Sequence, residues 1–186
     1  MQHAKVKCLC EAAIMLALAQ VLSYIKIEPL PSGGSIDLAM VPIIFFCFRY
    51  GLAWGTGVGF VYGLMQYFLG NGIAISWTTM IADYLVAYTL LGVGAGFFRG
   101  KKGGIYLGTV VGTFLRFLSS FVVGATVWAE YMPDEFLGMA MTNEWVYSFL
   151  YNMTWALPDA ILCVVVFALL QKPLRKYFTC ADLQQA

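Results

Sequence analysis

Residues 144–171 read EWVYSFLYNMTWALPDAILCVVVFALLQ, a long apolar run that ends immediately before Lys172. A helix crosses the hydrocarbon core of a bilayer in about 20 residues, so this run is long enough to span a membrane. Five further apolar segments precede it, at 8–27, 37–48, 51–70, 76–98 and 104–129, and only 37–48 is short for a span. The chain of 186 residues is 61% hydrophobic, with a mean hydropathy of +0.77. We therefore predict an all-α integral membrane protein with six transmembrane helices in a single domain, residues 1–186.

The basic residues predict the orientation of these segments. With the N-terminus in the cytoplasm, nine of the eleven lysines and arginines fall on the cytoplasmic side, as the positive-inside rule requires. They are Lys5, Lys7, Arg49, Arg99, Lys101, Lys102, Lys172, Arg175 and Lys176. We expect both termini in the cytoplasm. The first segment is followed by Lys26, Glu28 and a Pro/Gly/Ser turn rather than by a small-residue cleavage site, so we expect a helix and not a removable signal peptide.

Several classes of function are disfavoured. The net charge of +1 and the absence of a basic stripe outside the cytoplasmic flanks argue against nucleic-acid binding. The single histidine, His3, lies in the N-terminal tail, so no catalytic residues, metal site or cofactor are expected. No Gly-x-x-x-x-Gly-Lys-Ser/Thr motif is present, so a pumping activity would need energy from partner ATPases. A membrane-embedded enzyme or a purely structural protein remain the less favoured alternatives.

Three charged side chains lie within the apolar segments, where charge is costly and needs a role. Arg116 and Asp159 sit at similar depth, and we interpret them as a structural ion pair rather than as ligand contacts. Asp83 has no basic residue at its depth, so we interpret it as an unpaired acceptor for a cationic or hydrogen-bond-donating ligand. The alternative is that the hydroxyl of Thr78 or Thr79 satisfies this carboxylate.

Aromatic residues gather at the same level as Asp83. They are Trp77, Tyr84, Trp128, Tyr131, Trp145, Tyr147, Tyr151 and Trp155. An interfacial belt would explain each one singly, but Tyr147 and Tyr151 share a helix face and Asn152 brings an amide beside them. Such a set favours a pocket that stacks a flat ring and orients it by polar contacts. The partly apolar loop 130–143 is expected to fold back, as a lid would.

Small residues mark one face of the first helix. Ala13 and Ala17 are four residues apart, which lets another helix approach closely. This face would either pack inside the bundle or dock a partner subunit in the membrane, and the spacing alone does not decide between the two.

Over nearly its whole length the sequence resembles the thiamine-specific substrate-binding (S) subunits of energy-coupling factor (ECF) transporters. The matching stretches, in order, are Pro31–Ile36, Met40–Ile43, Phe48–Leu52, Gly70-Asn71, Asp83-Tyr84, Leu115–Phe117 with Gly124, and Trp145–Asn152. The resemblance implies a six-helix bundle in a prokaryotic plasma membrane that binds a vitamin near the outer surface. It also implies that the alanine face docks on a transmembrane scaffold subunit, which works with cytoplasmic ATPases.

The resemblance carries roles onto particular residues. Asp83 would receive the aminopyrimidine of thiamine with Tyr84 beside it, and Trp128, Tyr147 and Asn152 take the ring-stacking and polar positions. Tyr151 joins this candidate site through its shared face with Tyr147. Ser120 stands where the family often has histidine, and the outer loop is longer than usual and lacks the family's Ala-Pro-x-Gly turn. We expect thiamine as the ligand, with another vitamin or a thiamine precursor as the alternative.

Overall fold

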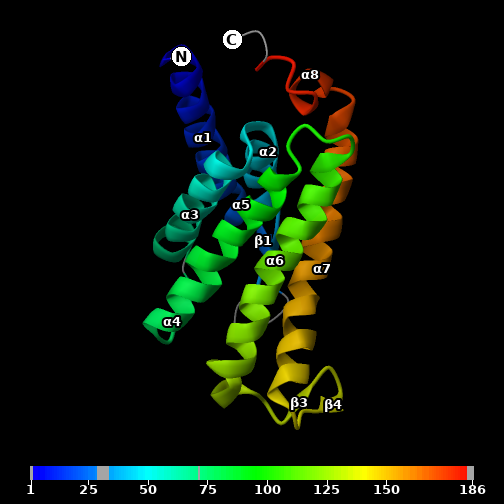
Figure 1. The fold of residues 1–186 in the computed structure, drawn as a ribbon. Coiled ribbons are helices and arrows are strands. Elements are labelled where there is room, and N and C mark those ends of the chain that lie inside the picture. Colours follow the sequence, from blue (N-terminus) through cyan, green and yellow to red (C-terminus); the bar gives the residue numbers. More distant parts are fainter. Residues whose placement is uncertain (1, 29–33, 71, 184–186) are drawn as a thin grey trace.

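The structure is a computed structural model that describes residues 2–28, 34–70 and 72–183 (Figure 1). Its long helices are α1 (Gln2–Ser23), α2 (Met40–Tyr50), α3 (Leu52–Leu69), α6 (Gly104–Thr126) and α7 (Glu144–Gln171). Between α3 and α6, one helical segment runs from Trp77 to Phe97 as α4 (Trp77–Met80), a π-helix η1 (Ile81–Val86) and α5 (Ala87–Phe97). A 3₁₀ turn η2 (Ala129–Tyr131) follows α6, and the short helix α8 (Arg175–Phe178) follows α7.

Four helices in the described part of the chain are long and apolar enough to cross a membrane. They are α1, the Trp77–Phe97 segment, α6 and α7. Helix α2 has only 11 residues, as the short second segment of the sequence predicted. Helix α3 has 18 residues, but its four glycines and Gln66 dilute its apolar content, and it is not among the four.

The fold is all-helical as expected, apart from two small hairpins in the described loops. Strands β1 (Lys26–Ile27) and β2 (Ile36–Asp37) pair antiparallel, so helix α1 ends at Ser23 instead of residue 27 and α2 begins at Met40 instead of residue 37. The prolines and glycines between the two strands predict a turn, and residues 29–33 of that predicted turn lie outside the described residues. Strands β3 (Glu135–Phe136) and β4 (Met139–Ala140) pair in the loop before α7.

Glycines set how closely α3 approaches the Trp77–Phe97 segment. A Cβ at Gly59 would lie 2.3 Å from the carbonyl oxygen of Tyr88, and one at Gly63 would lie 2.5 Å from that of Tyr84. No other residue permits this approach without a shift of the backbone. The Tyr84–Tyr88 stretch is therefore held against α3 by contacts that need glycine.

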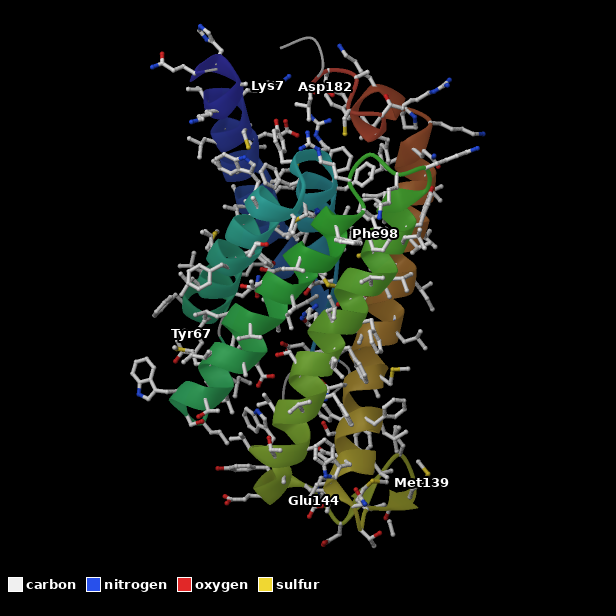
Figure 2. All side chains as sticks on the ribbon, viewed as in Figure 1. Lys7, Tyr67, Phe98, Met139, Glu144 and Asp182 are labelled. Carbon is white, nitrogen blue, oxygen red and sulfur yellow. The ribbon has the colours of Figure 1, made fainter. Side chains whose placement is uncertain are left out.

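The two chain ends lie at the same end of the molecule, opposite the β3–β4 hairpin (Figure 1). There Lys7 and Asp182 come together, with Lys7 Nζ 3.0 Å from the Asp182 carbonyl oxygen (Figure 2). Beside them Arg49 has no exposed surface. It donates to Glu11 at 2.5 and 3.0 Å, to the Asp182 carboxylate at 2.8 and 3.1 Å, and to the Tyr177 carbonyl oxygen at 3.0 Å. Arg49 and its three partners, Glu11, Asp182 and Tyr177, are called the Arg49 cluster below. The cluster joins α1, α2 and the C-terminal segment.

Candidate ligand-binding cavity

A cavity of about 250 Å³ opens in the half of the bundle that is remote from the chain ends. Its walls come from the second half of α6, the first half of α7, the Trp77–Phe97 segment and the β1–β2 hairpin. The lining includes Lys26, Glu28, Gly34, Ser35, Gln66, Ile73, Asp83, Tyr84, Tyr88, Arg116, Ser120, Gly124, Trp128, Tyr131, Tyr147, Ser148, Tyr151, Asn152 and Trp155. Aromatic walls with a few charged and amide groups are typical of sites for small, flat, polar ligands.

All seven residues that the sequence singled out for ligand contact line this one cavity. They are Asp83, Tyr84, Ser120, Trp128, Tyr147, Tyr151 and Asn152. Two other members of the predicted aromatic gathering do not line it. Trp77 is 78% exposed and Trp145 is 47% exposed, both on the outside of the bundle. The interfacial belt is the better explanation for these two tryptophans.

Asp83 has no basic partner among the ion pairs of the described residues, as expected. Its carboxylate does accept a hydrogen bond, because the indole Nε1 of Trp128 donates to Asp83 Oδ2 at 3.1 Å. The hydroxyl of Thr79 does not satisfy this carboxylate, because it donates to the Ser76 carbonyl oxygen in the cap of α4. Asp83 and Trp128, which are 45 positions apart in the chain, therefore form one polar unit in the cavity wall.

A π-helical turn carries Asp83 and Tyr84 into the wall. The turn spans Ile81–Val86, and such single π-helical turns inside α-helices are frequent at functional sites. Ser119 Oγ on α6 donates to the Ala82 carbonyl oxygen at 2.8 Å. This contact ties the π-helical turn to the neighbouring helix.

Tyr84 serves the cavity in an unexpected way. Its hydroxyl accepts from the Ile73 backbone N–H at 2.8 Å and lies 3.2 Å from the Ile73 carbonyl oxygen. The hydroxyl is thus committed to the segment between α3 and α4, and Ile73 itself lines the cavity. Tyr84 presents its ring to the cavity rather than a free hydroxyl.

The wall from α7 combines rings with an amide. The rings of Tyr147 and Tyr151 lie 5.7 Å apart, and Phe136 on β3 packs on them at 5.3 and 6.0 Å between centroids. The loop after α6 therefore folds back onto this wall, as its apolar content indicated. Asn152 is buried, and its Nδ2 donates to the Ser148 carbonyl oxygen at 2.8 Å, which fixes the amide beside the cavity.

Arg116 forms part of the cavity floor. Its Nη1 lies 3.6 Å from Asp159 Oδ2, so the predicted ion pair is present, although at this length it is not a hydrogen bond. Its guanidinium carbon also lies 4.6 Å from the centre of the Tyr88 ring and 4.5 Å from that of Trp155. Arg116 thus belongs both to the ion pair and to the cavity, two roles that the sequence had set as alternatives.

Sequence reasoning missed several lining residues, of which four bring a ring or a charge to the cavity. Tyr88 lies four residues after Tyr84, a helical spacing that could have indicated it. Arg116 was assigned to the ion pair alone. The hairpin residues Lys26 and Glu28 form an ion pair at 2.6 Å in the cavity wall, and nothing in their local sequence points there.

Comparison with known proteins gives a consistent result. The family model described as "Thiamine transporter protein (Thia_YuaJ)" matches residues 9–179. The thiamine transporter ThiT of Bacillus subtilis is 31% identical over 176 residues, which cover 87% of this chain and 88% of that protein. ThiT of Lacticaseibacillus paracasei is 29% identical over 196 residues, which cover 97% of this chain and 94% of that protein.

A solved structure of ThiT from Listeria monocytogenes has the same fold, with a TM-score of 0.80 over 94% of this chain and 98% of that one, at 21% identity. Transporter relatives from bacteria, together with several apolar helices of spanning length, identify a multi-pass protein of the cell membrane. From the match over residues 9–179 and the 31% identity to a relative of nearly equal length, we conclude that the chain belongs to the thiamine transporter protein family.

Proposed function

We propose that this chain is the substrate-binding subunit of an ECF-type vitamin uptake transporter and that thiamine binds in the cavity described above. One observation carries the proposal: seven residues chosen from the sequence for contact with an aminopyrimidine and a thiazolium ring line a single cavity. Relatives named as thiamine transporters support the choice of ligand.

The charges around the cavity support a monocationic ligand. Lys26 and Glu28 pair with each other, and Arg116 pairs with Asp159, so among the described residues the carboxylate of Asp83 has no basic partner of its own. Trp128 donates to that carboxylate without neutralising it. One excess negative charge among rings suits thiamine, because its thiazolium carries one positive charge and cations are attracted to aromatic faces.

The proposed contacts follow from this arrangement. Asp83 accepts from the exocyclic amine of the aminopyrimidine, since a carboxylate makes strong charge-assisted hydrogen bonds. The ring of Trp128, held at its edge by Asp83, offers a fixed face for stacking. Tyr147, Tyr151 and Asn152 on α7 enclose the thiazolium part of the ligand. Tyr84 contributes its ring to the wall, and Ser120 lies beside Asp83.

Coupling to energy is proposed to occur through α1. Ala13 and Ala17 are exposed on this helix, whereas Ala12 and Ala19 are buried against the bundle. The small-residue pair is thus free to receive a transmembrane scaffold subunit that works with cytoplasmic ATPases. We propose six membrane crossings in one domain, with both chain ends in the cytoplasm.

Thiamine titration of the detergent-purified protein, followed by tryptophan fluorescence, tests the ligand. Stacking on Trp128 predicts quenching that Trp128→Phe largely abolishes and that Trp77→Phe, the control at an exposed tryptophan outside the cavity, retains. Asp83→Ala should weaken binding by about 2 to 4 kcal/mol, because a charge-assisted hydrogen bond is lost and the ligand's donor is left unpaired. This loss corresponds to roughly a thirtyfold to thousandfold change in Kd.

The alternative ligands are separated in the same assay. If thiamine does not bind but another vitamin, or the aminopyrimidine half of thiamine alone, quenches the fluorescence, the cavity keeps its role and the named substrate is wrong. If no such compound binds and Asp83→Ala changes nothing, the binding-site proposal itself is wrong.

A further inference from the structure

A second hollow in the molecule is separate from the ligand-binding cavity. It is a groove of about 260 Å³ between α1 and α7, each of which packs on α2. All the side chains that line it are apolar, and none of them lines the cavity described above. We call it the α1–α7 groove. Its lining consists of Met15, Leu18, Leu22, Leu38, Val41, Pro42, Phe45, Val166, Phe167, Leu170, Leu174 and Phe178.

The open side of the α1–α7 groove faces the hydrocarbon of the bilayer. Helices α1 and α7 are both long and apolar enough to span a membrane, and Leu18 in the lining is 45% exposed. The floor comes from α2, where Val41 and Pro42 are buried. Lipid tails are the solvent at this depth. A groove that no described part of the chain fills is therefore in contact with lipid.

Basic side chains lie beside one end of the groove. The ring of Phe178 on α8 packs on Phe45 at 5.1 Å and on Phe167 at 6.2 Å between centroids. This packing fixes α8 against the groove and leaves Arg175 and Lys176 of the same helix exposed. Helix α8 lies at the end of the molecule where the two chain ends meet (Figure 1).

These charges have no partner within the described part of the chain. Lys172, at the end of α7, is exposed as well, and none of Lys172, Arg175 and Lys176 forms an ion pair with a described carboxylate. The nearby Asp182 is held by Arg49 and Lys7 instead. Three positive charges thus stand where an apolar groove reaches the end of its helices.

One kind of molecule satisfies both the charges and the apolar lining. Basic pockets between membrane helices on the cytoplasmic side bind the anionic headgroups of lipids, and a hydrocarbon chain enters an apolar groove from the bilayer without a desolvation cost. A free anion would leave the apolar lining without a role. An apolar helix of a partner protein would leave the three charges unpaired.

The face of α1 that we propose for docking the scaffold is a different one. Leu22 in the groove lies nine positions after Ala13, and at 100° per residue this places the two on opposite sides of the helix. Occupation of the groove by lipid is therefore compatible with a scaffold subunit on the Ala13/Ala17 face.

We propose that the α1–α7 groove binds an anionic phospholipid of the surrounding membrane, with one acyl chain along the apolar lining and the phosphate at Lys172, Arg175 and Lys176. This site goes beyond the vitamin transport proposed above, and its test needs no thiamine.

Native mass spectrometry of the protein, freed of lipid in detergent, tests the headgroup. Phosphatidylglycerol, which is anionic, should bind more tightly than phosphatidylcholine with the same acyl chains. Arg175→Gln/Lys176→Gln should weaken phosphatidylglycerol binding by about thirtyfold, since each basic residue near a membrane surface contributes about fivefold. Lys101→Gln/Lys102→Gln removes the same charge from the loop between α5 and α6, which contributes nothing to the groove, and should change binding by less than about threefold.

A second pair of variants tests the acyl chain. Val166 lines the groove, whereas its neighbour Val165 does not and is 48% exposed. Val166→Trp fills part of the groove and should abolish phosphatidylglycerol binding, and Val165→Trp adds the same side chain outside the groove and should retain it. Leu18→Trp fills the groove from α1 and covers the case in which Val166→Trp does not fold. Glycerol 3-phosphate, a headgroup without chains, should not bind at concentrations at which phosphatidylglycerol saturates.

The contrary outcomes are distinct. Equal binding of the two lipids, or equal effects of the two glutamine variants, would show that the basic residues hold no headgroup and would overturn the proposal. Binding of glycerol 3-phosphate as tight as that of phosphatidylglycerol would overturn it too, because the groove would have no part in binding. If Val166→Trp keeps its lipid but no longer co-purifies with the scaffold, the groove belongs to a protein partner. None of these results depends on whether the protein binds thiamine.

Discussion

Replacing Arg49 by methionine should strongly destabilise the protein. Methionine keeps much of the volume and the apolar stem but removes five hydrogen bonds to Glu11, Asp182 and the Tyr177 carbonyl oxygen. The side chains of Glu11 and Asp182 are only 17% and 9% exposed, so two partly buried carboxylates would lose the buried cation between them. Only the half-exposed Lys7, whose Nζ lies 3.6 Å from Asp182 Oδ2, would remain as a counter-charge. Removing one partner of a buried ion pair costs about 3 to 5 kcal/mol.

The lower end of that range applies here, because both carboxylates keep some access to water. A loss of about 3 kcal/mol corresponds to a fall in Tm of roughly 6 to 12 °C for a chain of this length. Thermal unfolding in detergent, followed by tryptophan fluorescence, measures it. Arg175→Met is the matched control, since Arg175 is exposed and should change the Tm by no more than a degree or two. Equal shifts for the two variants would refute the role of the Arg49 cluster.

The same cluster gives the unfolding a pH dependence. Hydrogen bonds from Arg49 hold the pKa of the Asp182 carboxyl below its ordinary value of about 3.9. A depressed pKa contributes stability above the ordinary value, and that contribution disappears as the pH falls through the pKa of the folded state. The difference in Tm between the original protein and Arg49→Met should therefore narrow as the pH is lowered from 5 toward 3. A constant difference over that window would contradict the assignment.

The remaining predictions concern ligand choice, coupling and topology. Ser120→His should tighten thiamine binding or change the preference among thiamine analogues, since Ser120 lies beside Asp83. Isothermal titration measures the Kd values, and unchanged values for all analogues would remove Ser120 from the site. Leucine or tryptophan at both Ala13 and Ala17 should leave thiamine binding by the isolated subunit intact while abolishing uptake and co-purification with the scaffold; normal uptake would exclude docking on this face. In a cysteine-free background, a cysteine at Asn143 should react with an impermeant reagent in intact cells and one at Gly103 should not. Labelling at Gly103 would overturn the orientation.

Several of the cavity-lining residues on helices were predictable because they carry a local signal. Asp83 is a charge in an apolar run, and Tyr147, Tyr151 and Asn152 lie on adjacent turns of one helix, so periodicity places them together. The contact between Asp83 and Trp128 was not predictable in this way, because it depends on how the π-helical turn faces the end of α6. The first case is local geometry and the second is tertiary packing.

The features that the sequence did not predict join distant segments. Strands of two residues, as in the β1–β2 hairpin, are too short for an alternating pattern, so a wall of the cavity has no signature in the sequence. Arg49 was counted among the cytoplasmic basic residues, but its burial depends on Glu11 and on Asp182, which is 133 positions away. The four-residue spacing of Gly59 and Gly63 also fits close helix packing, but only the structure shows that their partners are the backbone carbonyls of Tyr88 and Tyr84.

The π-helix Ile81–Val86 separates one helical segment into two parts with independent phase. A hydrogen bond from residue i to i+5 closes a loop one residue longer than the α-helical bond, so the turn acts as a one-residue insertion that does not interrupt the helix. On its far side, Gly92 must face Gly55, because a Cβ at Gly92 would lie 2.2 Å from the Gly55 carbonyl oxygen. Deleting a single residue within 81–86 would leave that seam in place and rotate everything before it by about 100°. The insertion thus lets the cavity-lining end of the segment take a helical phase that is set separately from that of the packing end.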